Sequence, residues 1–154
     1  MLVDRITTLT AFAPTPVVRT MYARAIDGGD IAAHMHAHAE CMQAAILFAD
    51  VSGFTALTEA LSRKSSAGAE ELTSLLNLYF TRMITHIESY RGQVVRLSGD
   101  AITAIFRVDD IPGCFVTNAM LYAMYAAIDM QIAMIDFQSL TTSVGEASLA
   151  LKIG

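Results

Sequence analysis

The chain has 154 residues, which is enough for one domain with a single core. Hydrophobic residues make up 54% of it and charged residues 16%, a composition that excludes an intrinsically disordered chain. The net charge of −5 argues against a surface for nucleic acid, which needs clustered Lys and Arg. A nucleotide substrate stays open, because a bound divalent cation can reverse the local sign of the field.

Residues 1–43 are interpreted as a lead-in segment to a domain that spans 44–154. The segment begins without an apolar run, and the two cysteines, Cys41 and Cys114, are far apart, so we expect a cytoplasmic protein. A short helix is expected over 17–25 and a Gly-rich turn over 27–30. Three histidines follow at alternate positions: His34, His36 and His38. As a strand they would share one face and could bind Zn²⁺, but in a linker such a cluster is usually solvated.

Residues 44–50 form a continuous apolar run that ends in Asp50, the pattern of a buried strand. Gly53 permits a tight bend, after which apolar residues recur at helical spacing up to Leu61. Residues 62–68 are polar and are predicted to form a loop.

A long helix is predicted from Ala69, with Arg91 in its last turn and Gly92 at its end. Its apolar face comprises Leu72, Leu75, Leu76, Tyr79, Met83, Ile84 and Ile87. Residues 94–98 and 102–106 then read as two strands of a hairpin, joined by Gly99 and Asp100.

Pro112 is expected to open a long apolar helix over 113–137. The run is long enough to span a membrane, but four polar residues interrupt it, and we predict a buried helix of a packed domain instead. These residues are Asn118, Asp129, Gln131 and Asp136. A last strand is predicted over 147–153, with Lys152 on the face opposite Leu151. The order of the elements indicates an α+β fold with helices packed against a mainly antiparallel sheet.

Two carboxylates are placed for metal chemistry. Asp50 ends the first strand and Asp100 lies in the hairpin turn, so they converge if the strands are neighbours. Paired carboxylates suit Mg²⁺, completed by water and substrate phosphates. The bend over 51–55 leads into a helix, whose N-terminal N–H groups favour anions such as a triphosphate. The chain contains no Walker A motif.

These residues carry a family resemblance. The segment 48–55, FADVSGFT, resembles the first metal motif of class III adenylyl and guanylyl cyclases, and 96–106, RLSGDAITAIF, resembles their second. The segment 149–154 resembles the strand that opens the second half of the family's domain. The sequence around Asp50 most resembles that of the bicarbonate-responsive soluble adenylyl cyclases. The resemblance implies a ferredoxin-like βαββαβ domain, truncated after the strand at 147–153, that pairs head to tail with a second cyclase domain.

The resemblance also implies a role for each matching residue. Asp50 and Asp100 would hold two Mg²⁺ ions, for which Mn²⁺ can substitute, and the carbonyl of Val51 would complete one coordination sphere. The 3′-hydroxyl of ATP would attack its own α-phosphate, giving 3′,5′-cyclic AMP and pyrophosphate. The backbone amides that would face the β- and γ-phosphates belong to Ser52, Gly53, Phe54 and Thr55.

Arg96 has two interpretations. It stands where many members of the family carry a base-selecting Lys or Glu, and a cation there disfavours guanine and favours ATP over GTP. In tandem relatives the same position lines a second, pseudo-symmetric site, where a cation could bind an anion such as bicarbonate.

Three functions remain open from the sequence. The first is an adenylyl cyclase, with little activity expected from 1–154 alone because no counterpart of the family's later ribose-binding Asn and Arg is found before Gly154. The alternative is a non-catalytic cyclase-like regulatory module that binds nucleotide or an anion. A third, another two-metal nucleotidyl-transfer enzyme, would need a nucleic-acid groove, for which the acidic composition offers no support.

Overall fold

The computed structural model describes residues 17–18, 41–64, 66–113 and 115–154. The turn expected over 27–30 and the histidines at 34, 36 and 38 lie outside the described residues, as does most of the helix expected over 17–25. Cys114 also lies outside them, whereas Cys41 is a free and exposed thiol.

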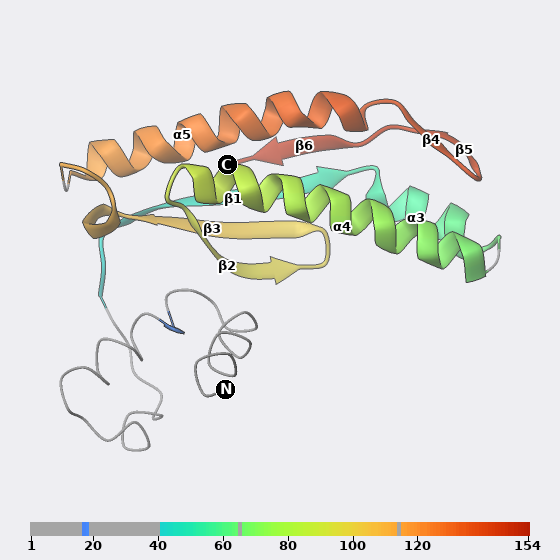
Figure 1. Ribbon diagram of the computed structural model, residues 1–154, viewed down its shortest axis with the longest axis horizontal. Helices are drawn as coiled ribbons and strands as arrows, with labels where there is room; N and C mark the ends of the chain where they lie inside the picture. Colours follow the sequence, from blue (N-terminus) through green and yellow to red (C-terminus); the bar gives the residue numbers. More distant parts are fainter. Residues whose placement is uncertain (1–16, 19–40, 65, 114) are drawn as a thin grey trace, which may run out of the picture.

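A four-stranded antiparallel sheet carries the fold (Figure 1). Its strands stand in the order β2 (Gln93–Ser98), β3 (Ala101–Arg107), β1 (Ala44–Ser52) and β6 (Ala150–Ile153). The long helices α4 (Ser66–Ser89) and α5 (Val116–Ala133) lie along one face of this sheet. The predicted α+β, ferredoxin-like βαββαβ order is confirmed.

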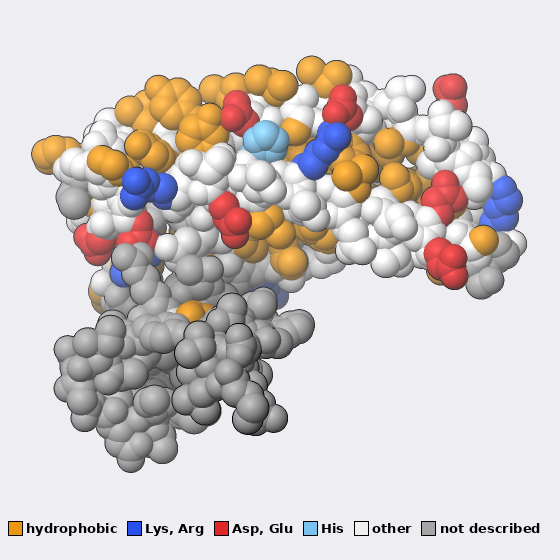
Figure 2. All heavy atoms as spheres, viewed as in Figure 1, with side chains coloured by type: hydrophobic (Ala, Val, Ile, Leu, Met, Phe, Trp, Pro, Cys, Tyr) orange, Lys and Arg blue, Asp and Glu red, His pale blue; other side chains and the backbone are white. Residues whose placement is uncertain are grey.

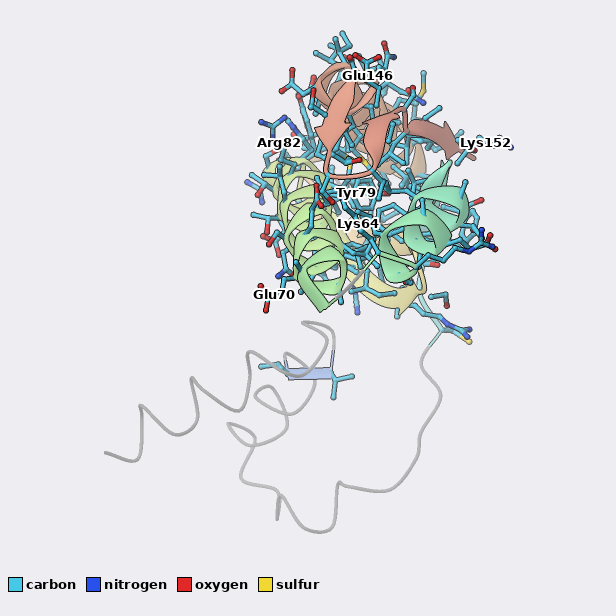
Figure 3. All side chains as sticks on the ribbon, turned by 90° about the vertical axis from the view of Figure 1, so that its right-hand side faces the viewer. Lys64, Glu70, Tyr79, Arg82, Glu146 and Lys152 are labelled. Carbon is cyan, nitrogen blue, oxygen red and sulfur yellow. The ribbon has the colours of Figure 1, made fainter. Side chains whose placement is uncertain are left out.

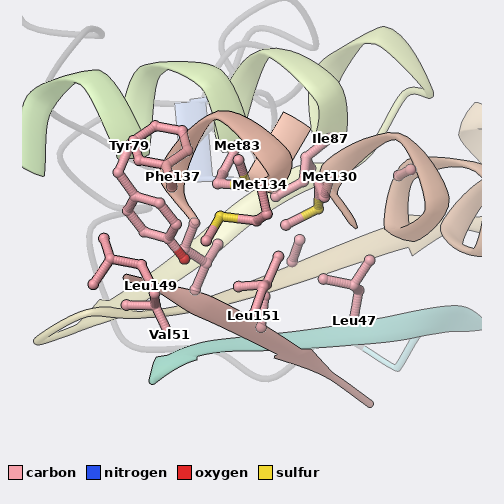
Figure 4. Close-up of a cluster of buried hydrophobic side chains, with 14 of the residues drawn as sticks. Leu47, Val51, Tyr79, Met83, Ile87, Met130, Met134, Phe137, Leu149 and Leu151 are labelled. Carbon is pink, nitrogen blue, oxygen red and sulfur yellow. The ribbon is translucent and has the colours of Figure 1, made fainter. Parts of the chain in front are cut away.

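The core lies between this sheet face and the two long helices (Figure 4). Strand β1 shows how the sequence directs it: Leu47, Ala49 and Val51 are buried, while Ile46 and Phe48 on the opposite face are exposed. Successive side chains of a strand point to opposite faces, so this alternation turns one side of β1 to the helices. The helices and the segment after them contribute Tyr79, Met83, Ile87, Met130, Met134 and Phe137.

The connection between the first two helices is shorter than predicted. Helix α3 (Phe54–Ser62) is followed by a turn at Arg63 and Lys64, and α4 already begins at Ser66, within the loop expected over 62–68. Ala67, Ala69 and Glu70 are exposed. The polar composition of this stretch therefore reflects a solvent-facing first helical turn and not a loop.

The end of α4 also differs from the prediction in one residue. Arg91, not Gly92, adopts the left-handed conformation, with a φ of 62°. Gly92 is needed for space, because a Cβ there would lie 2.6 Å from Cζ of Phe106 and 2.7 Å from Cγ2 of Ile87. A residue with no side chain thus lets the end of the helix approach the sheet closely.

The apolar helix begins later than predicted and is only half covered. A 3-10 turn, η2 (Val108–Asp110), precedes it, and α5 starts at Val116 and continues into η3 (Met134–Phe137). The prediction of burial holds for one face, with Ala119, Ala126 and Met130 buried. Figure 2 shows hydrophobic side chains along the outward edge of α5. The exposed ones are Phe115, Val116, Met120, Leu121, Met124, Tyr125, Ile128, Ile132 and Ile135. By length and composition, Val116–Phe137 could cross a membrane.

A small hairpin that the sequence did not predict follows α5. Strands β4 (Leu140–Thr142) and β5 (Gly145–Ala147) pair with each other, so the strand predicted over 147–153 is shortened to β6. The hairpin tip is hydrogen-bonded to α4 and to the turn before it: Ser143 donates its N–H to Glu71 at 2.9 Å, and Lys64 donates to the carbonyl of Ser143. Three-residue strands are too short to show a clear alternation in sequence, which explains the missed hairpin.

The hydrogen bonds between Ser143 and Glu71 make the stability of the fold depend on pH. Hydrogen bonds from the side chain and then the backbone of Ser143, with the charge of Lys64, hold the pKa of Glu71 below its usual 4.5. This contribution to stability is present above the unfolded pKa and is lost as the pH falls through the folded pKa. We expect Glu71→Gln to reduce the loss of stability between neutral pH and pH ~3, measured by urea unfolding. Glu70→Gln is the control and should keep the wild-type acid dependence.

Candidate metal and nucleotide site

Asp50 and Asp100 lie at the same end of adjacent strands. Asp50 stands near the end of β1, and Asp100 lies in the two-residue turn between β2 and β3. β1 pairs with β3, not with β2, and in this antiparallel register Ala49 faces Ile102. Neighbouring strands lie about 5 Å apart, so the end of β1 adjoins the turn that carries Asp100. The backbones of Asp50 and Asp100 are therefore near each other through β3, and the convergence of their carboxylates stays a prediction.

Tyr79 of α4 is buried near this end of the sheet. Its side chain is 0% exposed, and burial raises the pKa of its phenol far above the usual value of 10. The negative charges of Asp100 and then Asp50 raise that pKa further, so both carboxylates lie within electrostatic range of one hydroxyl. The sequence placed Tyr79 only on the apolar face of its helix. The available signal was the residue type, because a buried tyrosine hydroxyl needs a hydrogen-bond partner.

The bend after β1 directs the start of α3 toward this end of the sheet. Gly53 is the N-cap of α3 with a φ of 95°, and its carbonyl accepts the first helical hydrogen bond, from Leu57 at 3.2 Å. The first N–H groups of a helix have no partner within the helix and attract anions. The side chain of Phe54 is buried and that of Thr55 is exposed, so an anion here would meet backbone amides beside the threonine hydroxyl.

An open pocket of about 370 Å³ lies between α3, α4 and the β2–β3 turn. Its lining includes Phe54 and Thr55, which were predicted, and Asp100 with its neighbour in the turn. The sequence analysis gave no role in the site to the other lining residues, which are Thr58, Glu59, Leu72 and Leu76. Viewed from this end of the molecule, Tyr79 lies in the interior behind the helices, while Lys152 lies at the outside (Figure 3).

The other predicted residues are placed differently. Asp50, Val51 and Ser52 belong to β1 and do not line the pocket, and Asp50 pairs across the strands with Lys152 of β6. This cross-strand lysine is a cation that sequence reasoning did not assign to the site. Arg96 is exposed on the outer strand β2, opposite Thr103, and also lies outside the pocket.

Comparison with known proteins identifies the domain. A sequence profile described as the adenylate and guanylate cyclase catalytic domain matches residues 36–154. The chain belongs to this family. Adenylate cyclase type 10 of Rattus norvegicus is 33% identical to this cyclase domain over 72 residues, which are 46% of this chain and 4% of the rat protein. The human adenylate cyclase type 10 is 35% identical over 66 residues.

Solved structures show the same fold. The adenylyl cyclase CyaB from P. aeruginosa superposes with a TM-score of 0.56 at 26% identity, covering 72% of this chain and 53% of that one. A bacterial light-regulated adenylyl cyclase gives a TM-score of 0.64 at 19% identity, over 99% of this chain and 40% of that one. The guanylate cyclase domain of RhGC from Catenaria anguillulae, solved with GTP, gives 0.54 at 21% identity, over 73% and 54%. This cyclase domain thus spans about half the length, or less, of these structures.

The residues at this end of the cyclase domain fit a hard divalent cation. The donors are two carboxylates and the backbone oxygens of the β1 end, and oxygen-only sets of this kind suit Mg²⁺ or Mn²⁺. No group of three or more His, Cys, Asp or Glu side chains forms a metal cluster in the part of the chain that the structure describes. A cation here would therefore depend on Asp50, Asp100, a carbonyl, water and substrate phosphates.

Proposed function

We propose that this cyclase domain is an adenylyl cyclase that converts ATP to 3′,5′-cyclic AMP and pyrophosphate. The observation that supports it most is the approach of Asp50 and Asp100 at one end of the sheet, next to the N-terminus of α3. The choice of ATP is supported by the similarity to adenylate cyclases type 10, and by the cationic Arg96 at the position that resembles a base-selecting residue. We place the reaction in the cytoplasm.

The chain's own residues would bind and orient the substrate. Asp50, Asp100 and the carbonyl of Val51 would hold two Mg²⁺ ions, or Mn²⁺ in their place. When bound, these ions supply Lewis acidity, which lowers the pKa of an attacking hydroxyl and stabilises charge on a leaving pyrophosphate. The backbone amides of 52–55 at the α3 N-terminus would hold the β- and γ-phosphates. This positioning directs the α-phosphate toward the 3′-hydroxyl.

A second cyclase domain is the proposed partner. The solved relatives include the guanylyl cyclase domain of the RhoGC fusion protein from Blastocladiella emersonii, in a non-canonical dimeric form and in a monomeric form. In this chain the sheet face opposite the helices exposes Ile46 and Phe48 of β1. A partner covering that face would remove apolar surface from water and close the site from the other side.

One observation favours a second candidate function, a regulatory module without turnover. Arg96 is exposed outside the pocket that Asp100 lines, so its cation is free to bind an anion such as bicarbonate. Arg96→Ala separates the two roles. Loss of bicarbonate binding with unchanged ATP binding supports the anion site, and loss of the preference for ATP over GTP supports base selection.

The decisive experiment measures cyclic AMP and cyclic GMP formed from Mn–ATP and Mn–GTP. The chain is assayed alone and together with a second cyclase domain. We expect little product from the chain alone and cyclic AMP as the main product with the partner. Nucleotide binding without product in either case would favour the regulatory module, and cyclic GMP as the main product would contradict the choice of ATP.

A further inference from the structure

The Tyr79 hydroxyl has no assigned role, and its environment makes it unusual. The oxygen is buried and has no hydrogen-bond partner among the described residues. Buried polar groups are nearly always hydrogen-bonded, because an unsatisfied one pays its full desolvation cost. A phenylalanine would fill the same space without that cost, so the hydroxyl needs an explanation.

The ring of Tyr79 is held firmly. It packs edge-on against Phe137 with centroids 6.1 Å apart and an interplanar angle of 89°, and it lies 5.2 Å from the ring of Phe80. With its ring fixed in this way, the hydroxyl points toward the sheet at Val51 and Leu149 (Figure 4). Val51 directly follows Asp50 in β1.

Tyr79 also adjoins the pocket that Asp100 lines. Leu72 and Leu76 line that pocket, and Tyr79 follows them on the same face of α4 at helical spacing. Its hydroxyl therefore lies behind the pocket wall, between the helix and the end of β1. The influence of both aspartates on its phenol agrees with this position, and Asp100 acts on it more strongly than Asp50.

The geometry points to Tyr79 as a positioning residue for the aspartate pair, with its hydroxyl donating a hydrogen bond to the oxygen shell of a cation held there, on the Asp100 side. Because the hydroxyl has no hydrogen-bond partner among the described residues, the acceptor is a water bound to the Asp100 carboxylate and not the carboxylate itself. Outer hydrogen bonds of this kind orient metal-binding carboxylates, and their loss typically weakens metal affinity about 10- to 100-fold. The inference rests on the proposed metal site and names a residue that supports it from α4.

The test is Mn²⁺ binding to Tyr79→Phe, followed by the electron paramagnetic resonance signal of free Mn²⁺. We expect binding to weaken about tenfold. The melting temperature of the metal-free protein should stay the same or rise, because the change removes an unsatisfied hydroxyl. This combination separates positioning from a structural role, which would lower the melting temperature and leave Mn²⁺ affinity intact.

Tyr90→Phe is the matched control. The Tyr90 hydroxyl donates to Asp129 at 2.7 Å, on the α5 side of the fold and outside the pocket that Asp100 lines. Its loss is expected to lower the melting temperature and to leave Mn²⁺ binding unchanged. In an Asp100→Ala background, Tyr79→Phe should cause no further loss of affinity, because the carboxylate that Tyr79 positions is already removed.

The Mn²⁺ titrations test the role of Tyr79 separately from the metal site itself. Mn²⁺ affinity of Tyr79→Phe within about twofold of the wild type overturns the role of Tyr79, while the metal site survives if Asp50→Ala still abolishes binding. Wild-type protein that shows no saturable Mn²⁺ binding overturns both this inference and the proposed two-metal function.

Discussion

Asp100→Asn is expected to lower cyclic AMP formation by at least about 10²-fold, the size of effect seen when one electrostatic group of an active site is removed. The change takes away a negative charge and one oxygen of the proposed metal site. It keeps the turn, because Asn suits the same tight-turn positions as Asp. The assay uses Mn–ATP with a second cyclase domain present, and Mn²⁺ binding is measured on the same samples.

Asp100→Asn should not destabilise the folded state. Asp100 and Asp50 both act on the phenol of Tyr79, so without a cation they place two like charges near a buried region. Removing one of them should leave the melting temperature equal or higher, as is common where a site is built for function at a cost in stability. Asp109 is exposed on the turn η2, so Asp109→Asn is the control and should keep full activity. Unchanged turnover of Asp100→Asn would exclude a metal-binding role for this residue.

Much of the fold could be predicted because each main strand is either a continuous apolar run or an alternation of apolar and polar residues. The apolar run before Asp50 and the Gly99–Asp100 turn gave β1 and the β2–β3 hairpin within one or two residues. The resemblance to the cyclase family then implied a ferredoxin-like βαββαβ domain. Periodicity alone does not reveal which strands are neighbours, and β1 lies beside β3 where a simple reading of chain order suggests β2.

The differences between the predicted and the observed elements have physical causes. Helix α5 is apolar on all sides, so its composition did not show that only the face with Ala126 and Met130 is covered. The hairpin β4–β5 is defined by contacts of Ser143 with α4 and with Lys64, which are distant in sequence. A sequence pattern reports local periodicity and cannot report such contacts.

Only part of the site was predicted, because sequence patterns do not report contacts between distant residues. Asp50 and Asp100 lie in recognisable sequence motifs. Tyr79 and the pocket residues Leu72 and Leu76, in contrast, look like ordinary members of an apolar helix face. Their proximity to the aspartates arises only when α4 packs on the sheet. Lys152 is similar, because its position opposite Asp50 depends on the β1–β6 register.

Gly53→Ala is expected to be the most destabilising of the single substitutions considered. Gly53 has a φ of 95°, which a residue with a Cβ adopts only with strain. A Cβ there would also lie 2.6 Å from the carbonyl oxygen of Ser148, a backbone atom that cannot rotate away. Together the two effects should lower the free energy of unfolding by about 2–4 kcal/mol, measured by urea denaturation. Relief of the clash would also shift the start of α3, so nucleotide binding should fall as well.

Gly99→Ala separates the two contributions. Gly99 also has a positive φ, 64°, but a Cβ there would meet no atom within 4 Å. This substitution carries the conformational cost alone, about 1 kcal/mol. The difference between the two variants therefore measures how tightly the segment before β6 presses on the bend that follows Asp50. Equal losses of stability would mean that Ser148 moves aside freely, and the α3 N-terminus would then not be held in place by this contact.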